Sequence, residues 1–272
     1  DIKTIDPENY TIPVLASKDL RILKKIYKTT QRLSTLSNCY TGEIDLSLDK
    51  KYLRSDNSFN TLLKGAIIDR FEIRNKMSQG EIMFLDSTKY LNENQGPRSR
   101  HFQQQRIGMQ GITGVNEKVR LKMTIIPKGN FLANSVNYLL VPKSKANIKF
   151  ILGQLNSEIL NYVFKLSSTN SNVNGYEVNN LPIVVNSEFS QILGYVVDYL
   201  LELKGKFSSS GYKLIYMFYE ALLNAINYEL YFPTEIKSAG KEILKHLGDL
   251  KPINDTMSDE NKLAIIQSEF ER

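Results

Sequence analysis

The segment from Arg100 to Met123, RHFQQQRIGMQGITGVNEKVRLKM, gathers side chains that can bind a polyanion. It carries five Lys or Arg residues, three consecutive glutamines and one acid, Glu117, and it has glycines at 108, 111 and 114. Arg and Gln can bond to the edges of bases, whereas Lys mainly contacts phosphates. The segment therefore offers groups both for holding and for reading a nucleic acid.

The spacing of the basic residues adds to this interpretation if residues 118–123 form a strand. Alternate side chains of a strand share one face and lie about 7 Å apart. Lys118, Arg120 and Lys122 are then expected in a row, spaced like the phosphates of one DNA strand, while the apolar residues between them face a core. We expect these three residues to bind the nucleic-acid backbone.

Residues 106–112, RIGMQGI, alternate in the same way. Arg106 and Gln110 flank Gly108 on one face, and the missing side chain would let a base edge or another backbone approach closely. Arginine suits guanine and glutamine suits adenine in the major groove of DNA. We expect Arg106 and Gln110, together with Gln104 of the glutamine run, to read bases.

Charge is distributed unevenly along the chain, although the net charge is only +6. Residues 51–150 hold 17 basic and 7 acidic side chains, whereas residues 151–272 hold 10 and 15. Between Asn94 and Lys149 there are ten Lys or Arg residues and a single acid. This asymmetry is typical of a nucleic-acid footprint, and it adds Arg98, Arg100 and Lys128 to the expected backbone contacts.

Two other interpretations stay open at this stage. A basic strand face is often only a solvated surface, and the chain could be a helical interaction or scaffold module on which that surface is incidental. RNA recognition is a lesser alternative, because aromatic residues are not interleaved along the basic strands as stacking platforms would require.

Composition places the chain among ordinary globular proteins, with 272 residues, of which 42% are hydrophobic and 24% charged. No apolar run is long enough for a membrane span, and the first residues do not resemble a signal peptide, so we expect a cytoplasmic protein without a membrane partner. Cys39 is the only cysteine and there are two histidines, so neither a disulfide nor a zinc site is expected. Because the chain does not begin with methionine, we expect an excised fragment.

Motifs for catalysis are not found in the sequence. There is no Asn/Asp-Pro-Pro-Tyr methyl-transfer motif, no glycine-rich cofactor loop, no P-loop and no nucleophile elbow. The Glu260-Asn261-Lys262 element has the spacing of a magnesium nuclease, but carboxylates at the start of a helix are better explained by the helix dipole. We expect no catalytic residues, no metal site and no cofactor in this chain.

Hydrophobic periodicity predicts an α+β fold, in which a twisted, mainly antiparallel sheet region with supporting helices is followed by a helical tail. The chain has a helical pattern after Ser17, and the period changes from 2 to 3.6 near Asn147, where a helix to Leu166 begins. Short strands are expected between these helices at EIDLSL, AIIDRFEI, EIMFLD, RIGMQGI, KVRLKMTII and SVNYLLV.

The helical tail is expected to contain a hairpin of two helices and two shorter helices. The first helix follows Ser187, the return helix spans about 213–230 and is apolar almost all round, and the shorter helices span about 234–247 and 256–270. We therefore predict a recognition domain at 1–185 and a tail at 186–272.

Four blocks together resemble the C-terminal specificity domain of adenine-specific DNA methyltransferases. They are LKGAIIDRFEI (63–73), RIGMQGITGVNEKVRLKMTII (106–126), LANSVNYLLVP (132–142) and FILGQLNSEILNYVFKLSSTNSNVNGYEVNNLPI (150–183). They are most similar to type IIG restriction-modification enzymes and more distantly similar to the target recognition domains of type I specificity subunits. Such domains usually contain tryptophan, which this chain lacks.

The resemblance implies a module that recognises specific double-stranded DNA and gives target specificity to a parent chain. Lys64 and Arg70 match a block near the first basic strand and are expected at the DNA backbone, and Arg106 with Gln110 matches a block that carries polar groups toward DNA. The parent chain would be an adenine-specific methyltransferase with restriction activity, using S-adenosylmethionine and magnesium. Its catalytic domains would be partners of this module, which would itself be non-catalytic.

Overall fold

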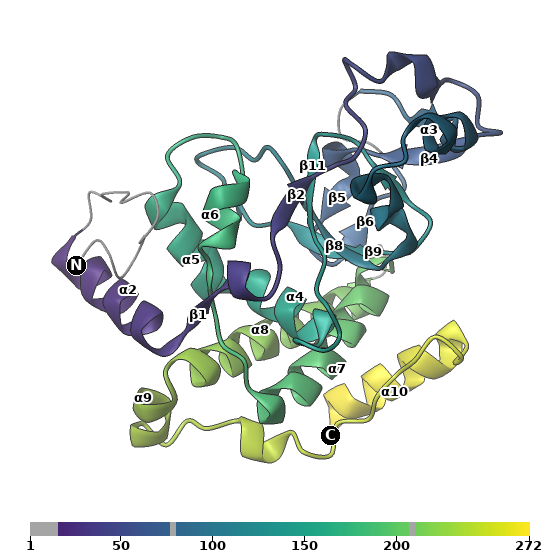
Figure 1. The fold of residues 1–272 in the computed structure, drawn as a ribbon. Coiled ribbons are helices and arrows are strands. Elements are labelled where there is room, and N and C mark those ends of the chain that lie inside the picture. Colours follow the sequence, from purple (N-terminus) through teal and green to yellow (C-terminus); the bar gives the residue numbers. More distant parts are fainter. Residues whose placement is uncertain (1–15, 77–79, 207–209) are drawn as a thin grey trace.

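A computed structural model describes residues 16–76, 80–206 and 210–272 (Figure 1). Short sheets occupy the first part of the chain and helices the last part, so the predicted α+β class is confirmed. The sheets lie in the upper part of Figure 1, and the green-to-yellow helices of the C-terminal part lie beneath them.

The central sheet has four antiparallel strands in the order β2-β11-β8-β9. These strands are β2 (Cys39–Thr41), β11 (Val136–Leu139), β8 (Arg106–Gln110) and β9 (Met123–Ile126). Because β8 is paired on both sides, four of its five residues are buried. One face contributes Ile107, Met109 and Met123 to the main core, and the other faces a smaller cluster that contains Ile126, Val136 and Tyr138.

A second sheet has the order β10-β4-β7-β3, in which β10 runs parallel to β4. It encloses a small core of its own with α3 and the 3-10 helix η4, around Tyr52, Tyr90 and Phe131. A hairpin, β5–β6, packs against the central sheet. The bounds are β3 (Leu53–Arg54), β4 (Asn60–Leu63), β5 (Ile68–Asp69), β6 (Glu72–Ile73), β7 (Met83–Leu85), α3 (Ser87–Glu93), η4 (Pro97–Gln103) and β10 (Phe131–Leu132).

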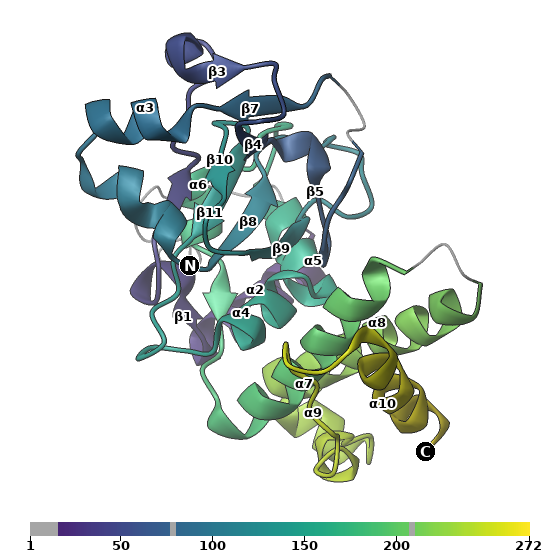
Figure 2. The ribbon, with the colours of Figure 1, turned by 90° about the vertical axis from the view of Figure 1, so that its right-hand side faces the viewer.

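Helices cover the lower face of the central sheet, with α4 packed directly on β8 and β9 and α7 packed on α4 (Figure 2). A two-residue ladder of β1 (Gln31–Arg32) with β12 (Pro182–Ile183) joins the first helix to the end of the sheet region. The helices are α2 (Ser17–Thr29), α4 (Ile148–Leu155), α5 (Glu158–Ser167), α6 (Gly175–Asn179), α7 (Ser187–Lys204), α8 (Ser210–Tyr231), α9 (Pro233–Ser238) and α10 (Asp259–Glu271).

The change of period at Asn147 is confirmed, because α4 begins at Ile148 and the Asn147 side chain accepts a hydrogen bond from the backbone N–H of Lys149 at 2.9 Å. The expected single helix to Leu166 is wrong in one respect. It is interrupted at Asn156 and Ser157, where the Ser157 hydroxyl caps a new helix by accepting from the N–H of Leu160.

Three further expectations about elements need correction. EIDLSL (43–48) is not a strand, because only Ile44 makes a bridge there and the Asp45 carboxylate instead organises a turn with the N–H groups of Ser47 and Leu48. The polar stretch from Ser168 to Asn180, for which the sequence predicts no helix or strand, contains α6, and β12 follows shortly after it. The helix α8 is not apolar-and-buried all round, since Leu214 is 63% exposed and Met217 54%.

A single main core runs across the proposed boundary at residue 185. Gly153 of α4 lies so close to α7 that a Cβ there would meet Leu193 at 2.9 Å and Val197 at 3.0 Å. The division into 1–185 and 186–272 stays a prediction. Within the described ranges, no helix is both long and apolar enough to cross a membrane.

Candidate nucleic-acid interface

Arg106 is fully buried rather than presented to solvent. Its side chain has no exposed surface, and Nη1 donates to both carboxylate oxygens of Glu43, at 3.1 and 3.0 Å. The guanidinium also lies 4.7 Å from the centre of the Tyr138 ring. The expectation that Arg106 faces a bound base does not agree with this geometry, because β11 pairs with the far side of β8 and makes it a central strand.

Arg106 instead fixes the turn between β9 and β10. Its Nη2 donates to the carbonyl of Asn130, and the N–H of Gly129 donates to the carbonyl of Phe102 in η4 at 2.8 Å. Gly129 has φ +90, a conformation that favours glycine. The turn that carries Lys128 is therefore held against η4 from two sides.

Gln110 and Gly108 also have internal roles. The Gln110 amide donates to the carbonyl of Ile68 at 2.7 Å, which joins β8 to the β5–β6 hairpin. A Cβ on Gly108 would meet the Ile126 side chain at 2.6 Å, so the space expected for a base edge is filled by the protein's own core. The predicted pair of reading residues around Gly108 is therefore directed inward.

The row of three cations is wrong, because β9 begins only at Met123 and residues 118–122 are not a strand. Arg120 is 1% exposed, and its guanidinium donates to the hydroxyls of Thr113 and Ser168 and to the carbonyl of Asn170. The side chain of Asn161 in α5 bonds to the N–H of Arg120 at 2.8 Å and to the carbonyl of Lys118 at 2.9 Å. A helix side chain thus takes the place of a neighbouring strand.

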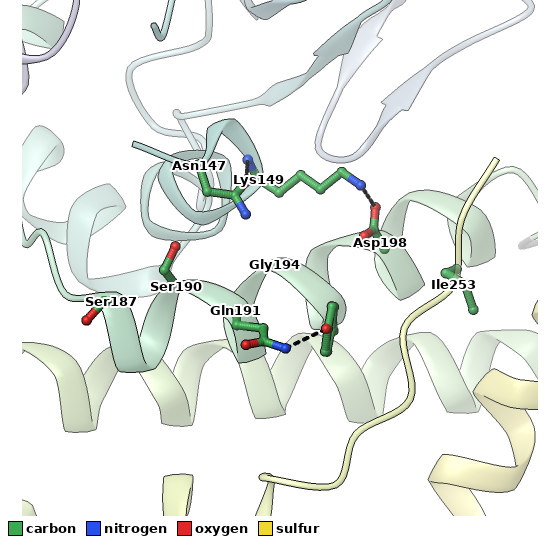
Figure 3. A pocket seen from close by; sticks show the side chains of 9 residues that line it. Asn147, Lys149, Ser187, Ser190, Gln191, Gly194, Asp198 and Ile253 are labelled. Atoms are coloured by element: carbon green, nitrogen blue, oxygen red, sulfur yellow. Dashed lines mark hydrogen bonds and ion pairs between the residues drawn. The ribbon is translucent and has the colours of Figure 1, made fainter. Parts of the chain in front are cut away.

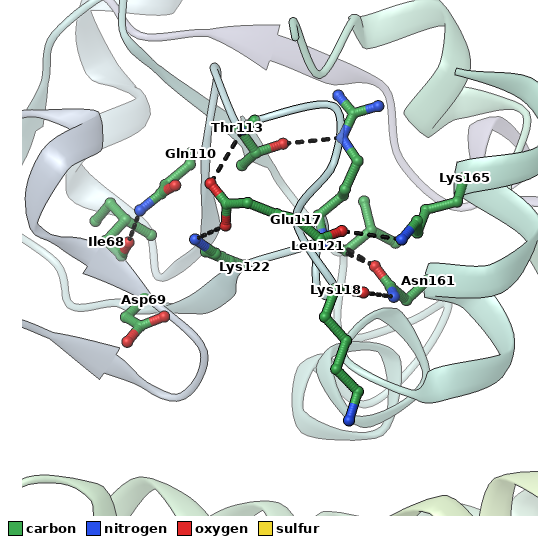
Figure 4. A network of polar contacts seen from close by, with 12 residues as sticks. Ile68, Asp69, Gln110, Thr113, Glu117, Lys118, Leu121, Lys122, Asn161 and Lys165 are labelled. Carbon is green, nitrogen blue, oxygen red and sulfur yellow. Dashed lines mark hydrogen bonds and ion pairs between the residues drawn. The ribbon is translucent and has the colours of Figure 1, made fainter. Parts of the chain in front are cut away.

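The two lysines of that segment differ in their availability (Figure 4). Lys122 forms an ion pair with Glu117, and this contact lowers the pKa of the Glu117 carboxyl. Lys118 extends away from the network, and its ammonium has no partner among the described residues. Of the predicted row, only Lys118 is an exposed and unpaired cation.

Lys64 and Arg70, expected at the DNA backbone, make contacts within the protein. Lys64 donates to the carbonyl of Glu81 at 3.1 Å. Arg70 pairs with Glu220 of α8 and donates to the carbonyl of Asn156 at 2.6 Å. Arg70 therefore connects the β5–β6 hairpin to the helical tail.

The remaining predicted residues are exposed and gather on one side of the central sheet. Gln104 and Lys128 line a hollow of about 710 Å³, which we call the Gln104 groove. Arg98 and Arg100 lie on η4 and are exposed, but each also has a contact within the protein: Arg98 donates to the carbonyl of Thr41, and Arg100 donates to the side-chain oxygen of Gln95 at 2.9 Å. The lining residues of the groove are Gln104, Gln105, Pro127, Lys128, Val141, Pro142, Lys143, Ala146, Asn147 and Ile148.

The groove is electropositive because no carboxylate is among its lining residues. The ammonium groups of Lys128 and Lys143, and the side-chain amides of Gln104 and Gln105, have no hydrogen-bond partner in the described part of the chain. The rest of its lining includes apolar side chains, such as Pro127, Val141 and Ile148. Such a surface can hold an anionic, partly planar ligand.

His101 is not among the lining residues of the groove, and its Nδ1 is 2.8 Å from the Tyr138 hydroxyl. Partial burial, with Arg106 and Arg98 nearby, lowers the pKa of His101 below its usual value. The imidazole is therefore held neutral and joins η4 to the central sheet. It is a supporting residue rather than an anion ligand.

A second hollow continues from the groove past Asn147, between α4 and α7 (Figure 3). Here Lys149 reaches across to Asp198 of α7, with 2.5 Å between Nζ and Oδ1. Burial raises the pKa of Asp198, an effect that Lys149 opposes. The lysine is neutralised there, so this second hollow adds no unpaired cation to the groove.

Sequence reasoning missed Gln105 as a groove residue and counted Lys143 only as part of the charge run. Gln105 could have been chosen as the last of the three consecutive glutamines, and Lys143 as the lysine that follows Pro142. The sequence does not show that the fold brings these two segments together. Among the described residues, no cluster of His, Cys, Asp and Glu could hold a metal ion.

No protein-family model matches the chain, and no curated protein matches it. Among solved structures, it is similar to that of the type IIL restriction-modification enzyme MmeI in complex with DNA, with a TM-score of 0.46 and 11% identity. The match covers 89% of this chain and 36% of that one, so the chain spans little more than a third of the enzyme's length. A TM-score this low does not establish a shared function.

Proposed function

We propose that this chain binds double-stranded DNA through the Gln104 groove and the neighbouring surface of η4. The observation that carries the proposal is the groove itself, whose lining combines two unpaired lysines and two unpaired amides with apolar side chains and contains no carboxylate. Lys128 and Lys143 would contact phosphates, with Arg98 and Arg100 extending the cationic surface.

We further propose that the module gives target specificity to catalytic domains in a longer parent chain. The support is the resemblance of the four sequence blocks to specificity domains of adenine methyltransferases, together with the missing motifs for cofactor binding and base chemistry. In such a parent, S-adenosylmethionine and magnesium belong to the catalytic domains, and DNA modification places the protein in the cytoplasm. An adenine methyltransferase must extrude its target base, so a separate module that grips the flanking sequence is useful.

The salt dependence of duplex binding by the 272-residue chain tests the proposal. Each phosphate contact contributes a slope of about −0.9 in log K against log salt. Four contacts, from Arg98, Arg100, Lys128 and Lys143, predict a slope between about −3 and −4. A chain that does not bind duplex DNA at low salt, or binds with no salt dependence, contradicts the proposal.

A helical interaction module is the second candidate, and it has one observation in its favour. Leu214, Met217 and Phe218 of α8 are 63%, 54% and 43% exposed and lie at helical spacing. Self-association or partner binding that is lost in a Leu214→Ser/Met217→Ser variant, combined with no DNA binding, would favour it.

A further inference from the structure

We propose that Gln105 is a specificity-determining residue of the groove and reads adenine in the major groove of duplex DNA. This inference deepens the proposed function and rests on it. A glutamine amide can donate to adenine N7 and accept from the adenine N6 amino group at once, which gives a bidentate contact that no other base pair reproduces.

The first support is the availability of the Gln105 amide. Gln105 is exposed, lines the groove, and has no side-chain partner among the residues that the structure describes. The two reading candidates from the sequence are engaged elsewhere, since Arg106 is bound to Glu43 and Gln110 to the carbonyl of Ile68. Among the groove's lining residues, Gln104, Gln105 and Asn147 carry side-chain amides, and Asn147 is used as the cap of α4.

The second support is the position of Gln105 between two hollows. It lines both the Gln104 groove and a further hollow of about 400 Å³. That hollow is acidic, because it contains Asp255 together with Asp198 and Glu202, which pair with its lysines Lys149 and Lys262. Because these carboxylates repel phosphates, a bound duplex would be limited to the groove side of Gln105, which lies at the boundary between the two hollows, whereas Gln104 lines only the groove. Lys128 and Lys143 stand in the groove's lining, where they would hold phosphates beside it.

The third support is the rigidity of the backbone beneath it. A reading side chain discriminates well only when its backbone is fixed. Gln105 directly precedes Arg106, whose guanidinium is bound to Glu43 and to the carbonyl of Asn130 in the interior. On its other side, the N–H of Gln104 closes η4 on the carbonyl of His101 at 3.0 Å. The buried arginine is thus a positioning residue for the glutamine beside it.

The test begins with selection of preferred sequences by the wild-type chain from a randomised duplex pool. The affinity of wild type, Gln105→Ala and Gln103→Ala for the preferred duplex is then measured. The same three proteins are also tested on duplexes in which one preferred adenine at a time is replaced by 7-deazaadenine. Gln103 is an exposed glutamine two residues away that does not line the groove, so it is a matched control. We expect Gln105→Ala to bind the preferred duplex about 5- to 150-fold more weakly, with random duplex unchanged.

The 7-deazaadenine duplex lacks the N7 acceptor. At one position of the duplex, this substitution should weaken binding by wild type and by Gln103→Ala. It should not weaken binding by Gln105→Ala any further. If duplex is bound with a preferred sequence and Gln105→Ala behaves like Gln103→Ala, the reading role is wrong while the DNA-binding proposal stands. If the chain binds no duplex at all, the proposed function fails and the reading role fails with it.

Discussion

The most basic side chains of a DNA-binding candidate need not be the ones that touch DNA. Arg106 and Arg120 are the largest fully buried side chains of the chain's described part, and each saturates several internal acceptors. Arg106 is neutralised by Glu43, although its Nε has no partner among the described residues, and the donors of Arg120 meet hydroxyl and carbonyl oxygens. Long unpaired groups such as Lys128 and Gln105 are left at the surface, where they can meet a ligand.

Replacing Arg106 with Ala should therefore affect the stability of the fold more than it affects DNA binding. The change leaves the Glu43 carboxylate buried and unpaired, which is expected to lower the free energy of unfolding by about 3–5 kcal/mol at neutral pH. The loss should shrink as pH falls, because burial already raises the pKa of Glu43 and the carboxyl can then take up a proton. Denaturant unfolding at pH 7.5 and pH 5.0 measures both effects.

The matched control is the double variant Arg106→Met/Glu43→Leu, which removes both charges. It should be markedly more stable than Arg106→Ala, since no buried charge is left alone. Equal stability of wild type and Arg106→Ala would contradict the interior role of the guanidinium.

His101 should make stability depend on pH in a known direction. Its pKa in the folded protein is lowered, so the unfolded chain binds a proton more readily. This contribution to stability is fully present above the usual pKa of 6.5 and is lost as pH falls through the lowered value. The denaturant midpoint of His101→Gln should fall less than that of wild type between pH 7.5 and pH 5.0. Identical pH dependence of the two proteins would show that His101 titrates normally.

Among the helices and strands, the hydrophobic pattern of the sequence correctly predicted those that depend mainly on contacts between residues close together in the chain. The alternation in 106–110 predicted β8, and the apolar stripe after Asn147 predicted α4. The same alternation in 118–122 failed, because Asn161, about 40 residues later, bonds to that backbone in place of a strand. The burial of Arg106 could not be predicted from the local pattern either, because it depends on the pairing of β8 with β11, which lies about 30 residues away in the sequence.

Asn161 should therefore be a structural residue of the 118–121 segment. Replacing it with Ala leaves the N–H of Arg120 and the carbonyl of Lys118 without partners, at an expected cost of about 1–3 kcal/mol. Hydrogen exchange should accelerate at the amides of Arg120 and Leu121. Asn92→Ala, in an exposed position of α3, is the control and should change neither quantity. Unaltered exchange in Asn161→Ala would contradict the assigned role.

At the scale of the whole molecule, the tail is part of the support for the sheet. The main core includes residues from Leu23 to Ile266, and α7 fills the lower surface of α4, on which β8 and β9 rest. The Arg70 contacts with Glu220 and Asn156 tie the upper hairpin to the same helices. The groove depends on this support, because it is lined by the connection between η4 and β8, the β9–β10 turn, and the segment from Val141 to the start of α4.

We therefore expect the complete chain to unfold in one cooperative transition. A version ending at residue 185 should lack a cooperative transition, because the faces of α4 that contact Leu193 and Val197 are left open to water. Calorimetry of both versions measures this. A sharp transition in the shortened chain would instead support two independent domains at 1–185 and 186–272.

If the Gln104 groove holds the phosphates of duplex DNA, the salt dependence of binding must change when the lysines of the groove are removed. Lys128→Ala/Lys143→Ala should weaken the binding of preferred and random duplexes alike and reduce the slope by about two units. The control, Lys237→Ala/Lys241→Ala, removes two exposed lysines of the tail and the same net charge. The slope of the control should be unchanged. If both variants lose the same amount of slope, or if neither variant loses any, the groove lysines do not hold the phosphates.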